Sequence, residues 1–208
     1  PNLLACLATI VNTCSKLTRE MIMIPRQLYD SDHEMFRDSL RKFLEIEAMP
    51  NHEQWESDGM VSDDIWLKAG EQGFLCPMVP EEYGGVGTDF LYNCIVNEEV
   101  SRSGCTGLGW SLHNDISVPY IVRYGSDYQK KRYLPRCVSG ELITAIAMTE
   151  PGAGSDLQGT KTTAVLDGEN YILNGSKTFI TNGQKAGLVI VVAKTDTSAG
   201  SKGISLFL

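Results

Sequence analysis

The sequence lacks the features that mark several classes of protein. It contains only three histidines, His33, His52 and His113, and none of its six cysteines forms a CxxC pair. We therefore expect no metal site, and in a chain of 208 residues the cysteines need not form a disulfide framework, which favours a reducing compartment. No apolar run reaches the roughly 18 residues that a membrane-spanning helix needs, so no membrane span is expected.

Positive charge is also scarce. Lysine and arginine total 18 against 26 aspartates and glutamates, which gives a formal net charge of −8. Binding to nucleic acid depends on clustered positive charge, so nucleic acid is not an expected partner. Hydrophobic residues make up 42% and charged residues 21% of the chain, which is typical of a globular protein with its own core.

The two ends of the chain stand apart from the rest. Residues 3–11 form a short apolar run, but the nearest positive residues, Lys16 and Arg19, follow it instead of preceding it as in a signal peptide. We expect residues 1–23 to be a leader or an added segment, with a short structural helix as the alternative. The last residues, 204–208, are apolar like a strand in mid-sheet, so the chain is expected to be a fragment of a longer protein.

Residues 24–140 show the pattern of an all-helical domain. Capping boxes open two of the expected helices, at Ser31 and at Ser126. Apolar residues at helical spacing predict buried faces, formed by Ile65, Trp66 and Ala69 in one helix and by Phe90, Leu91, Cys94 and Ile95 in another. The expected helices run from Ser31 to Pro50 and over 62–73, 88–103, 109–124 and 126–137.

From Glu141 onward the apolar pattern approaches a period of two and β-branched residues become common. Dipeptides typical of tight hairpins occur at Asp167-Gly168, Asn174-Gly175 and Asn182-Gly183. Such closely spaced turns leave no room for crossover helices. The sequence therefore predicts an α+β fold, with an all-helical N-terminal domain over 24–140 followed by a truncated antiparallel β-domain over 141–208. Its expected strands are Leu142–Thr149, Thr162–Leu166, Tyr171–Leu173, Lys177–Thr181, Leu188–Thr195 and Ile204–Leu208.

A glycine-containing loop follows the first expected strand. It reads Thr149-Glu150-Pro151-Gly152-Ala153-Gly154-Ser155-Asp156. Glycines allow a ligand to approach the backbone closely, and consecutive N–H groups can bind an anion, which suits a pyrophosphate. By itself the loop is more often a simple turn, since it has neither the GxGxxG spacing of a dinucleotide-binding fold nor the Gly-Lys-Ser/Thr of a P-loop.

Three ordered motifs together resemble the acyl-CoA dehydrogenase family. They are the string AMTEPGAGSDLQG at 147–159, the string NGSKTFITNG at 174–183 and the loop PEEYGG at 80–85. The resemblance covers residues 24–208 and is closest to the long-chain type. It implies a helical N-terminal domain, a middle β-domain and a C-terminal helical bundle, with FAD between the middle domain and the bundle.

The resemblance also implies a reaction and partners. The expected reaction is the α,β-dehydrogenation of acyl-CoA thioesters in fatty acid β-oxidation, with electrons passed to an electron-transfer flavoprotein. The expected location is the cytoplasm, or the mitochondrial matrix if the source is a eukaryote. The family also implies a homo-oligomer, a tetramer.

Cofactor-binding residues follow from the matched motifs. Thr149 is expected to hydrogen-bond the flavin ring, Thr181 to bond near its reactive edge, and Phe179 to pack on it as an aromatic plate where many relatives carry Trp. Ser155 is expected near a phosphate or the CoA part of the substrate. The full expected FAD set is Ile146, Ala147, Met148, Thr149, Gly154, Ser155, Phe179, Ile180 and Thr181, with Ser155 also assigned to substrate.

No residue of this chain is expected to be the catalytic base, because in the family the base lies in the C-terminal bundle. Glu150 is expected to fix its loop instead. The chain as given is therefore expected to be inactive and to expose an apolar patch on its strands. His113 is expected in the core or at an interface, and Glu98 and Glu99 on a solvated face or at a helix contact. Two alternatives stay open: a flavin oxidase or hydroxylase of the same fold, and a non-catalytic module that binds a partner.

Overall fold

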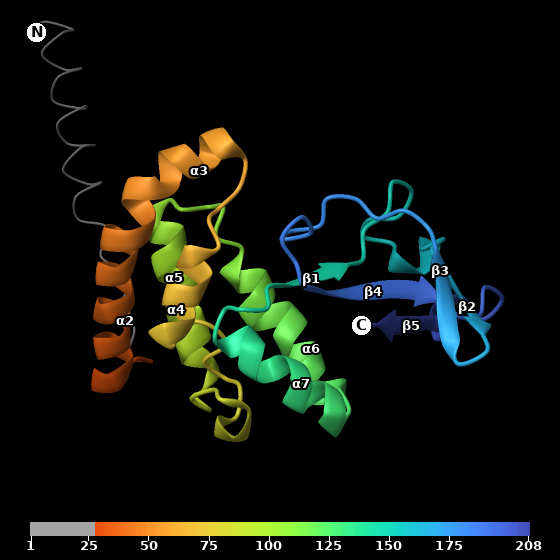
Figure 1. Ribbon diagram of the computed structural model, residues 1–208, viewed down its shortest axis with the longest axis horizontal. Helices are drawn as coiled ribbons and strands as arrows, with labels where there is room; N and C mark the ends of the chain where they lie inside the picture. The colour runs from red at the N-terminus through yellow and green to blue at the C-terminus, as the bar shows by residue number, and fades with distance from the viewer. Residues whose placement is uncertain (1–27) are drawn as a thin grey trace, which may run out of the picture. The chain divides into compact units, whose positions relative to one another are not determined.

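The structure is a computed structural model that describes residues 28–208. Residues 31–208 form one compact unit, shown in Figure 1. The segment 1–23, expected to be a leader or an added segment, lies outside the described residues. The chain from residue 31 onward folds first into helices and then into a sheet, as the sequence predicts.

The helical part contains α-helices with π and 3₁₀ turns between them. The helices are α2 (Ser31–Phe43), α3 (His52–Asp58), α4 (Asp64–Glu71), α5 (Phe90–Ser103), α6 (Val118–Tyr124) and α7 (Asp127–Val138). Two π-helical segments, η1 (Leu44–Ala48) and η4 (Leu112–Ser117), extend α2 and precede α6. The sequence predicts that the first helical run ends at Pro50, but the helical backbone continues through this residue. It sits in a 3₁₀ turn, Met49–Asn51, where its missing N–H costs no hydrogen bond, and α3 follows at once.

Local signals in the helical part are confirmed in most places. The Ser126 hydroxyl accepts from the backbone N–H of Gln129 and the Gln129 side chain accepts in return, which is the expected capping box. The stripe Ile65, Trp66 and Ala69 is buried. Phe90, by contrast, is exposed, because α5 begins there, after an N-cap formed by Asp89.

Glu99 of α5 lies at a buried helix contact. Its carboxylate receives hydrogen bonds from Arg37 and Arg41 of α2, at 2.9–3.1 Å. Burial opposes ionisation of Glu99, but these two guanidinium groups outweigh it and lower its pKa. The expectation of a helix–helix contact is therefore confirmed for Glu99.

The sheet contains five strands and is mixed. They are β1 (Thr144–Ala147), β2 (Thr163–Asp167), β3 (Asn170–Asn174), β4 (Leu188–Lys194) and β5 (Ile204–Phe207). The pairs β2–β3 and β4–β5 are antiparallel, as their short turns predict. The pair β1–β4, however, is parallel, and β2 meets β4 in parallel at Thr163 and Lys194. Residues 148–187 supply the long connection that a parallel pair needs, so the β-domain is present but not antiparallel throughout.

One expected strand is absent. Residues 177–181 do not pair in the sheet, so the strand expected at Lys177–Thr181 is wrong. Phe179 has φ 55° and Asn182 has φ 64°, whereas strand residues have strongly negative φ. Residues 175–187 therefore form an irregular connection with turns between β3 and β4.

His113 joins the helical part to the sheet, as expected of a core or interface histidine. Its ring is fully buried. Nδ1 accepts the backbone N–H of Thr144 at 3.2 Å, so Nε2 carries the proton and donates to the Cys137 carbonyl at 3.0 Å. Burial disfavours the charged ring and lowers the pKa of His113 to about 4.

This buried neutral ring predicts a loss of stability in mild acid. Between about pH 6.5 and pH 4 the unfolded chain binds a proton at His113 and the folded chain does not, so the free energy of unfolding falls by about 3 kcal/mol as the pH falls through that window. Urea unfolding at a series of pH values measures it. His113→Gln should flatten the curve in this window, because glutamine takes up no proton there. An unaltered slope in His113→Gln would contradict the assignment.

Candidate cofactor site

Two segments far apart in the sequence meet where β1 ends. The chain leaves β1 at Ala147 and passes through Met148 and Thr149 into the glycine loop. The Thr149 carbonyl accepts the backbone N–H of Thr178 at 2.9 Å. The two sequence motifs at 147–159 and 174–183 therefore lie side by side at these two residues.

The expected cofactor residues differ in exposure. Ile146 and Ala147 are buried in β1, while Met148, Thr149 and Ile180 are partly exposed. Gly154, Ser155 and Thr181 are exposed, and Phe179 is 93% exposed. Among the described residues, no hydrogen bond joins Gly154 or Ser155 to the segment that carries Phe179 and Thr181. The structure thus brings the end of β1, in the first segment (the motif at 147–159), next to the second segment (the motif at 174–183). One side of each segment is exposed to solvent.

The glycine loop is a tight turn with an accessible backbone. Glu150 and Ala153 exchange two backbone hydrogen bonds, at 2.9 and 3.1 Å, which fold Pro151 and Gly152 into the tip. A side chain placed at Gly152 or Gly154 would meet nothing within 4 Å. The loop therefore offers its backbone to a ligand without obstruction, as a phosphate-binding role requires.

A buried ion pair ties the loop to the second segment. Lys177 Nζ donates to Glu150 Oε1 at 2.8 Å and to the Met148 carbonyl at 3.0 Å. The same carboxylate accepts the backbone N–H groups of Lys161 and Thr162, at 2.7 and 2.9 Å, and the hydroxyl of Thr162. Lys177 and Thr178 therefore donate hydrogen bonds to the backbone carbonyls of Met148 and Thr149, two consecutive residues of the first segment.

The charge state of Glu150 follows from these contacts. Burial opposes its ionisation, but hydrogen bonds from Lys177, from Thr162 and from the backbone N–H groups outweigh it and lower its pKa to about 2. A carboxylate with that pKa is a poor general base near neutral pH. The geometry therefore favours the expected role of Glu150 in fixing the loop.

The sequence patterns do not reveal the roles of Lys177 and Asn182. They place Lys177 in a strand, although a lysine inside an otherwise apolar and hydroxyl-bearing stretch needs a partner if it is buried. They place Asn182 in a hairpin turn. Its side chain instead donates to the backbone carbonyls of Gly109 and Thr144.

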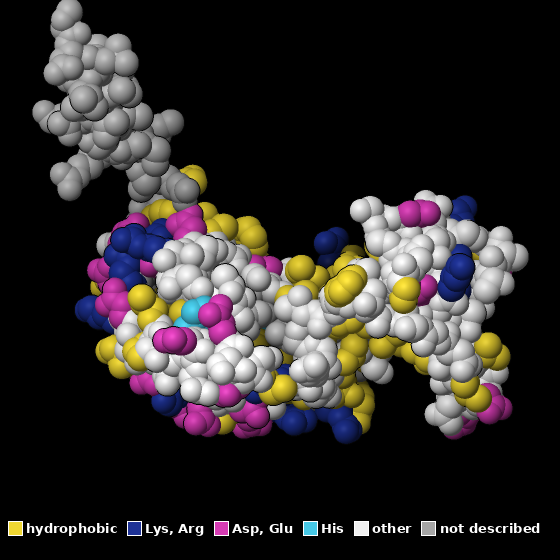
Figure 2. Space-filling model, turned by 90° about the horizontal axis from the view of Figure 1, so that it is seen from above, with side chains coloured by type: hydrophobic (Ala, Val, Ile, Leu, Met, Phe, Trp, Pro, Cys, Tyr) yellow, Lys and Arg dark blue, Asp and Glu magenta, His cyan; other side chains and the backbone are white. Residues whose placement is uncertain are grey.

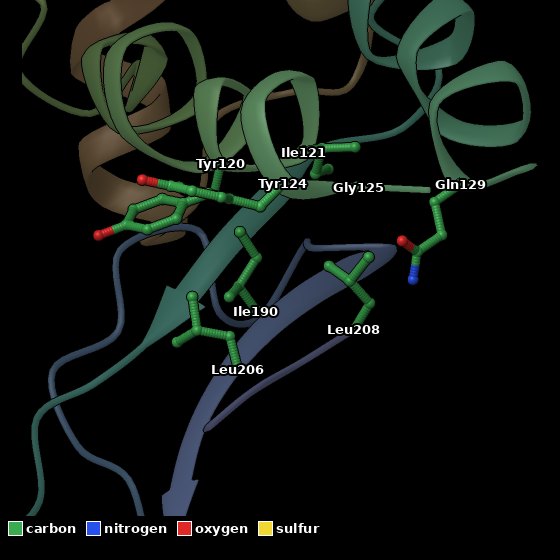
Figure 3. Close-up of a pocket in the computed structure, with 8 residues that line it drawn as sticks. All are labelled: Tyr120, Ile121, Tyr124, Gly125, Gln129, Ile190, Leu206 and Leu208. Carbon is green, nitrogen blue, oxygen red and sulfur yellow. The ribbon is translucent and has the colours of Figure 1, made fainter. Parts of the chain in front are cut away.

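Two cavities lie near the sheet. A cavity of about 250 Å³ adjoins the second segment and is lined by Gly59, Met60, Val61, Trp66, Gly107, Ile180, Asn182, Gly183, Gln184 and Lys185. Figure 3 shows another, in which Ile190, Leu206 and Leu208 face Tyr120 and Tyr124 of α6. The first cavity includes an expected cofactor residue, Ile180, and the second includes none.

The strands also expose apolar side chains. Figure 2 shows hydrophobic side chains on the surface of the β-domain. Those of β2, β3 and the C-terminal strand are at least 39% exposed, at Val165, Leu166, Tyr171, Ile172, Leu173, Leu206 and Leu208. Apolar side chains are thus exposed on these strands, and because consecutive residues of a strand alternate between the two faces of the sheet, they lie on both faces.

Residues 28–208 contain no candidate membrane span and no candidate metal site. Over residues 28–208, no helix has the length and apolarity to cross a membrane. Within that range, no group of three or more His, Cys, Asp or Glu is arranged to hold a metal ion.

The order of the elements and the two adjoining motifs define the class of protein: a helical domain followed by a mixed β-domain, the order that the family resemblance implies. Comparison with family models gives the same result. Residues 30–141 match the N-terminal domain of acyl-CoA dehydrogenase and residues 145–208 match its middle domain. The chain belongs to the acyl-CoA dehydrogenase family, which comprises flavoprotein oxidoreductases of fatty acid and lipid metabolism.

Individual relatives are similar over most of this chain. The long-chain specific, mitochondrial acyl-CoA dehydrogenase of Sus scrofa is 53% identical over 185 residues, which are 88% of this chain and 43% of the relative. The crystal structure of an acyl-CoA dehydrogenase from Geobacillus kaustophilus has a TM-score of 0.85 at 54% identity, over 88% of this chain and 48% of that one. A glutaryl-CoA dehydrogenase from Mycobacterium smegmatis in complex with FADH2 has a TM-score of 0.79 at 32% identity, over 87% of this chain and 46% of that one. The chain thus spans less than half the length of each.

The buried pair yields a test of the site's architecture. Glu150→Gln removes the charge that Lys177 faces, so we expect a loss of about 3 kcal/mol in the free energy of unfolding at pH 7. The folded pKa lies below the unfolded value of 4.5, so the wild-type advantage is complete above that pH and is lost as the pH falls toward about 2. Denaturant unfolding at pH 7 and pH 3 measures both effects.

A surface pair provides the matched control. Arg136 contacts Glu141 at 3.8 Å, and both side chains are more than half exposed. Glu141→Gln should cost less than about 1 kcal/mol, because exposed ion pairs contribute little. Equal losses for Glu150→Gln and Glu141→Gln would contradict the structural importance of the buried pair.

Proposed function

We propose that the protein catalyses the FAD-dependent α,β-dehydrogenation of acyl-CoA thioesters in fatty acid β-oxidation. The observation that carries the proposal is the hydrogen bond between Thr178 and Thr149, which joins the two family motifs at an exposed edge. The open backbone at Gly152 and Gly154 beside that edge suits a phosphate-bearing cofactor. The similarity to long-chain relatives supports a long-chain acyl-CoA as the substrate.

The residues present fit the flavin in chemical type. Phe179 offers a nearly fully exposed aromatic face, and Thr149 and Thr181 offer hydroxyl groups for polar edges of the ring. Gly154 and Ser155 would meet a phosphate, with Ser155 also near the CoA part of the substrate. Ile146, Ala147, Met148 and Ile180 would complete the apolar wall. When bound, FAD supplies the acceptor for the hydride that leaves the β-carbon of the substrate.

The proposal extends to partners and location. Electrons would pass to an electron-transfer flavoprotein, and the protein would act as a homotetramer. A location in the mitochondrial matrix is proposed if the source is a eukaryote, since the similar porcine protein is named as mitochondrial. The division into domains at residues 140 and 141 is proposed on the same family basis.

The test uses the protein as its gene encodes it. Purified protein should be yellow, with a flavin absorption band near about 450 nm. Anaerobic addition of a long-chain acyl-CoA should bleach that band, and an electron-transfer flavoprotein should restore it faster than air does. Rapid restoration by air alone would indicate the oxidase alternative, and a colourless protein in a stable complex with another chain would indicate the non-catalytic one. Either result would overturn the proposal.

Phe179 provides a mutational test. Because its side chain is 93% exposed, Phe179→Ala should leave the melting temperature of the flavin-free protein nearly unchanged. The loss of aromatic contact should weaken FAD binding about tenfold, which corresponds to about 1.4 kcal/mol. Titration of flavin-free protein with FAD measures the dissociation constant. Phe90→Ala is the matched control, since Phe90 is 54% exposed and outside both segments, and it should not alter FAD affinity.

A further inference from the structure

We propose that Asn182 is a positioning residue that fixes Thr181 relative to the helical domain. The inference rests on the proposed function, in which Thr181 meets the flavin, and it adds a residue outside the expected cofactor set. Asn182 follows Thr181 directly in the chain, and its side chain contacts two other parts of the fold.

The side-chain amide of Asn182 uses its donor group twice. Nδ2 donates to the Gly109 carbonyl at 3.2 Å and to the Thr144 carbonyl at 3.2 Å. An amide nitrogen carries two hydrogens, so these two bonds employ its full donor capacity. Aspartate has the same shape but no donor when ionised, so it would place a negative charge against two carbonyl oxygens.

The contact with Gly109 is tight on both sides. Gly109 has φ 65°, and a Cβ at that position would lie 2.2 Å from Oδ1 of Asn182. Asn182 itself has φ 64°, a conformation that asparagine tolerates better than most residues. The absence of a Cβ at Gly109 and the tolerance of asparagine for positive φ at Asn182 therefore allow these two residues to approach each other closely.

Thr144 extends the contact into the helical domain. Its carbonyl accepts from Asn182, and its backbone N–H donates to the buried ring of His113 in η4. Gly109 immediately precedes Trp110, where the helix that contains η4 and α6 begins. A continuous path of hydrogen bonds thus runs from this helix, through the first residue of β1, to the residue beside Thr181.

The turn that contains Asn182 does not need this side chain to form. Gly183 N–H donates to the Ile180 carbonyl at 2.9 Å, and the N–H groups of Lys185 and Ala186 donate to the Asn182 carbonyl at 2.9 and 2.8 Å. These backbone bonds define the turn. The side chain instead sets where the turn lies against Gly109 and Thr144, so its loss should displace Thr181 without unfolding the domain.

Displacement of Thr181 would have a large effect on a bound flavin. Hydrogen bonds weaken steeply with distance and angle, and ligand sites tolerate errors of only about 0.5 Å in the placement of their groups. We therefore expect an effect on flavin affinity and on the flavin spectrum that exceeds any effect on stability.

The first experiment substitutes Asn182 in the protein as its gene encodes it. Asn182→Asp and Asn182→Gly should each weaken FAD binding by about tenfold or more, because Thr181 is no longer held at the position in which it meets the flavin. The visible circular dichroism of bound flavin should change, and the melting temperature of the flavin-free protein should move little. Asn170→Asp, at an exposed residue of β3 outside both motifs, is the control and should change neither property.

A double-mutant cycle tests the contact with Gly109 directly. Gly109→Ala should weaken FAD binding in the wild-type background, because its methyl group displaces Asn182. In the Asn182→Gly background the methyl group has room, so the same substitution should have a smaller effect. The backbone strain of alanine at positive φ is common to both backgrounds and cancels in the comparison.

Four outcomes would overturn the inference. One is additive effects of Asn182→Gly and Gly109→Ala on FAD affinity, which would mean that their contact does not act on the site. Another is a large fall in melting temperature with unchanged FAD affinity and flavin spectrum, which would mean a structural role alone. If the wild-type protein binds no flavin, the proposed function fails and the inference fails with it. A flavin-binding wild type with unaffected variants would remove the inference only.

Discussion

The ionised carboxylate of Glu150, buried beside the end of β1, is the constraint on which the candidate site depends. A buried charge is tolerated only when hydrogen bonds and an opposite charge replace the water that it loses. Here the donors come from Lys161 and Thr162 at the start of β2 and from Lys177 in the irregular segment. Three separate stretches of chain must therefore assemble together, and their meeting point adjoins the glycine loop.

A second polar anchor lies at the other end of the same segment. Lys177 holds one end to Met148 and Glu150, and Asn182 holds the other to Gly109 and Thr144. The four residues between these anchors, 178–181, make one backbone bond to the first segment, at Thr178. The segment is thus fixed at both ends while its middle, Phe179 to Thr181, stays on the surface, which is the arrangement a rigid ligand-contacting edge requires.

These anchors also explain how far the sequence could predict the structure. Capping at Ser126, the buried stripe at Trp66 and the Asp167-Gly168 hairpin are local signals, and the structure confirms them. The strand expected at Lys177–Thr181 is wrong because its β-branched and aromatic residues have strand propensity, whereas long-range contacts of Lys177 and Asn182 determine its path. The parallel pairing of β1 with β4 depends on residues 148–187 as a whole, so no local pattern could reveal it.

Phe179 has two properties that an ordinary turn does not require. Its side chain is 93% exposed, and its φ of 55° is a conformation that bulky residues rarely adopt. Neither property helps folding, since exposure gives no apolar burial and positive φ in a non-glycine residue costs of order 1 kcal/mol or more. A turn under no other constraint would favour glycine or asparagine at this position. The proposed contact with the flat ring of a flavin accounts for an aromatic residue at this position, held between the polar anchors Lys177 and Asn182.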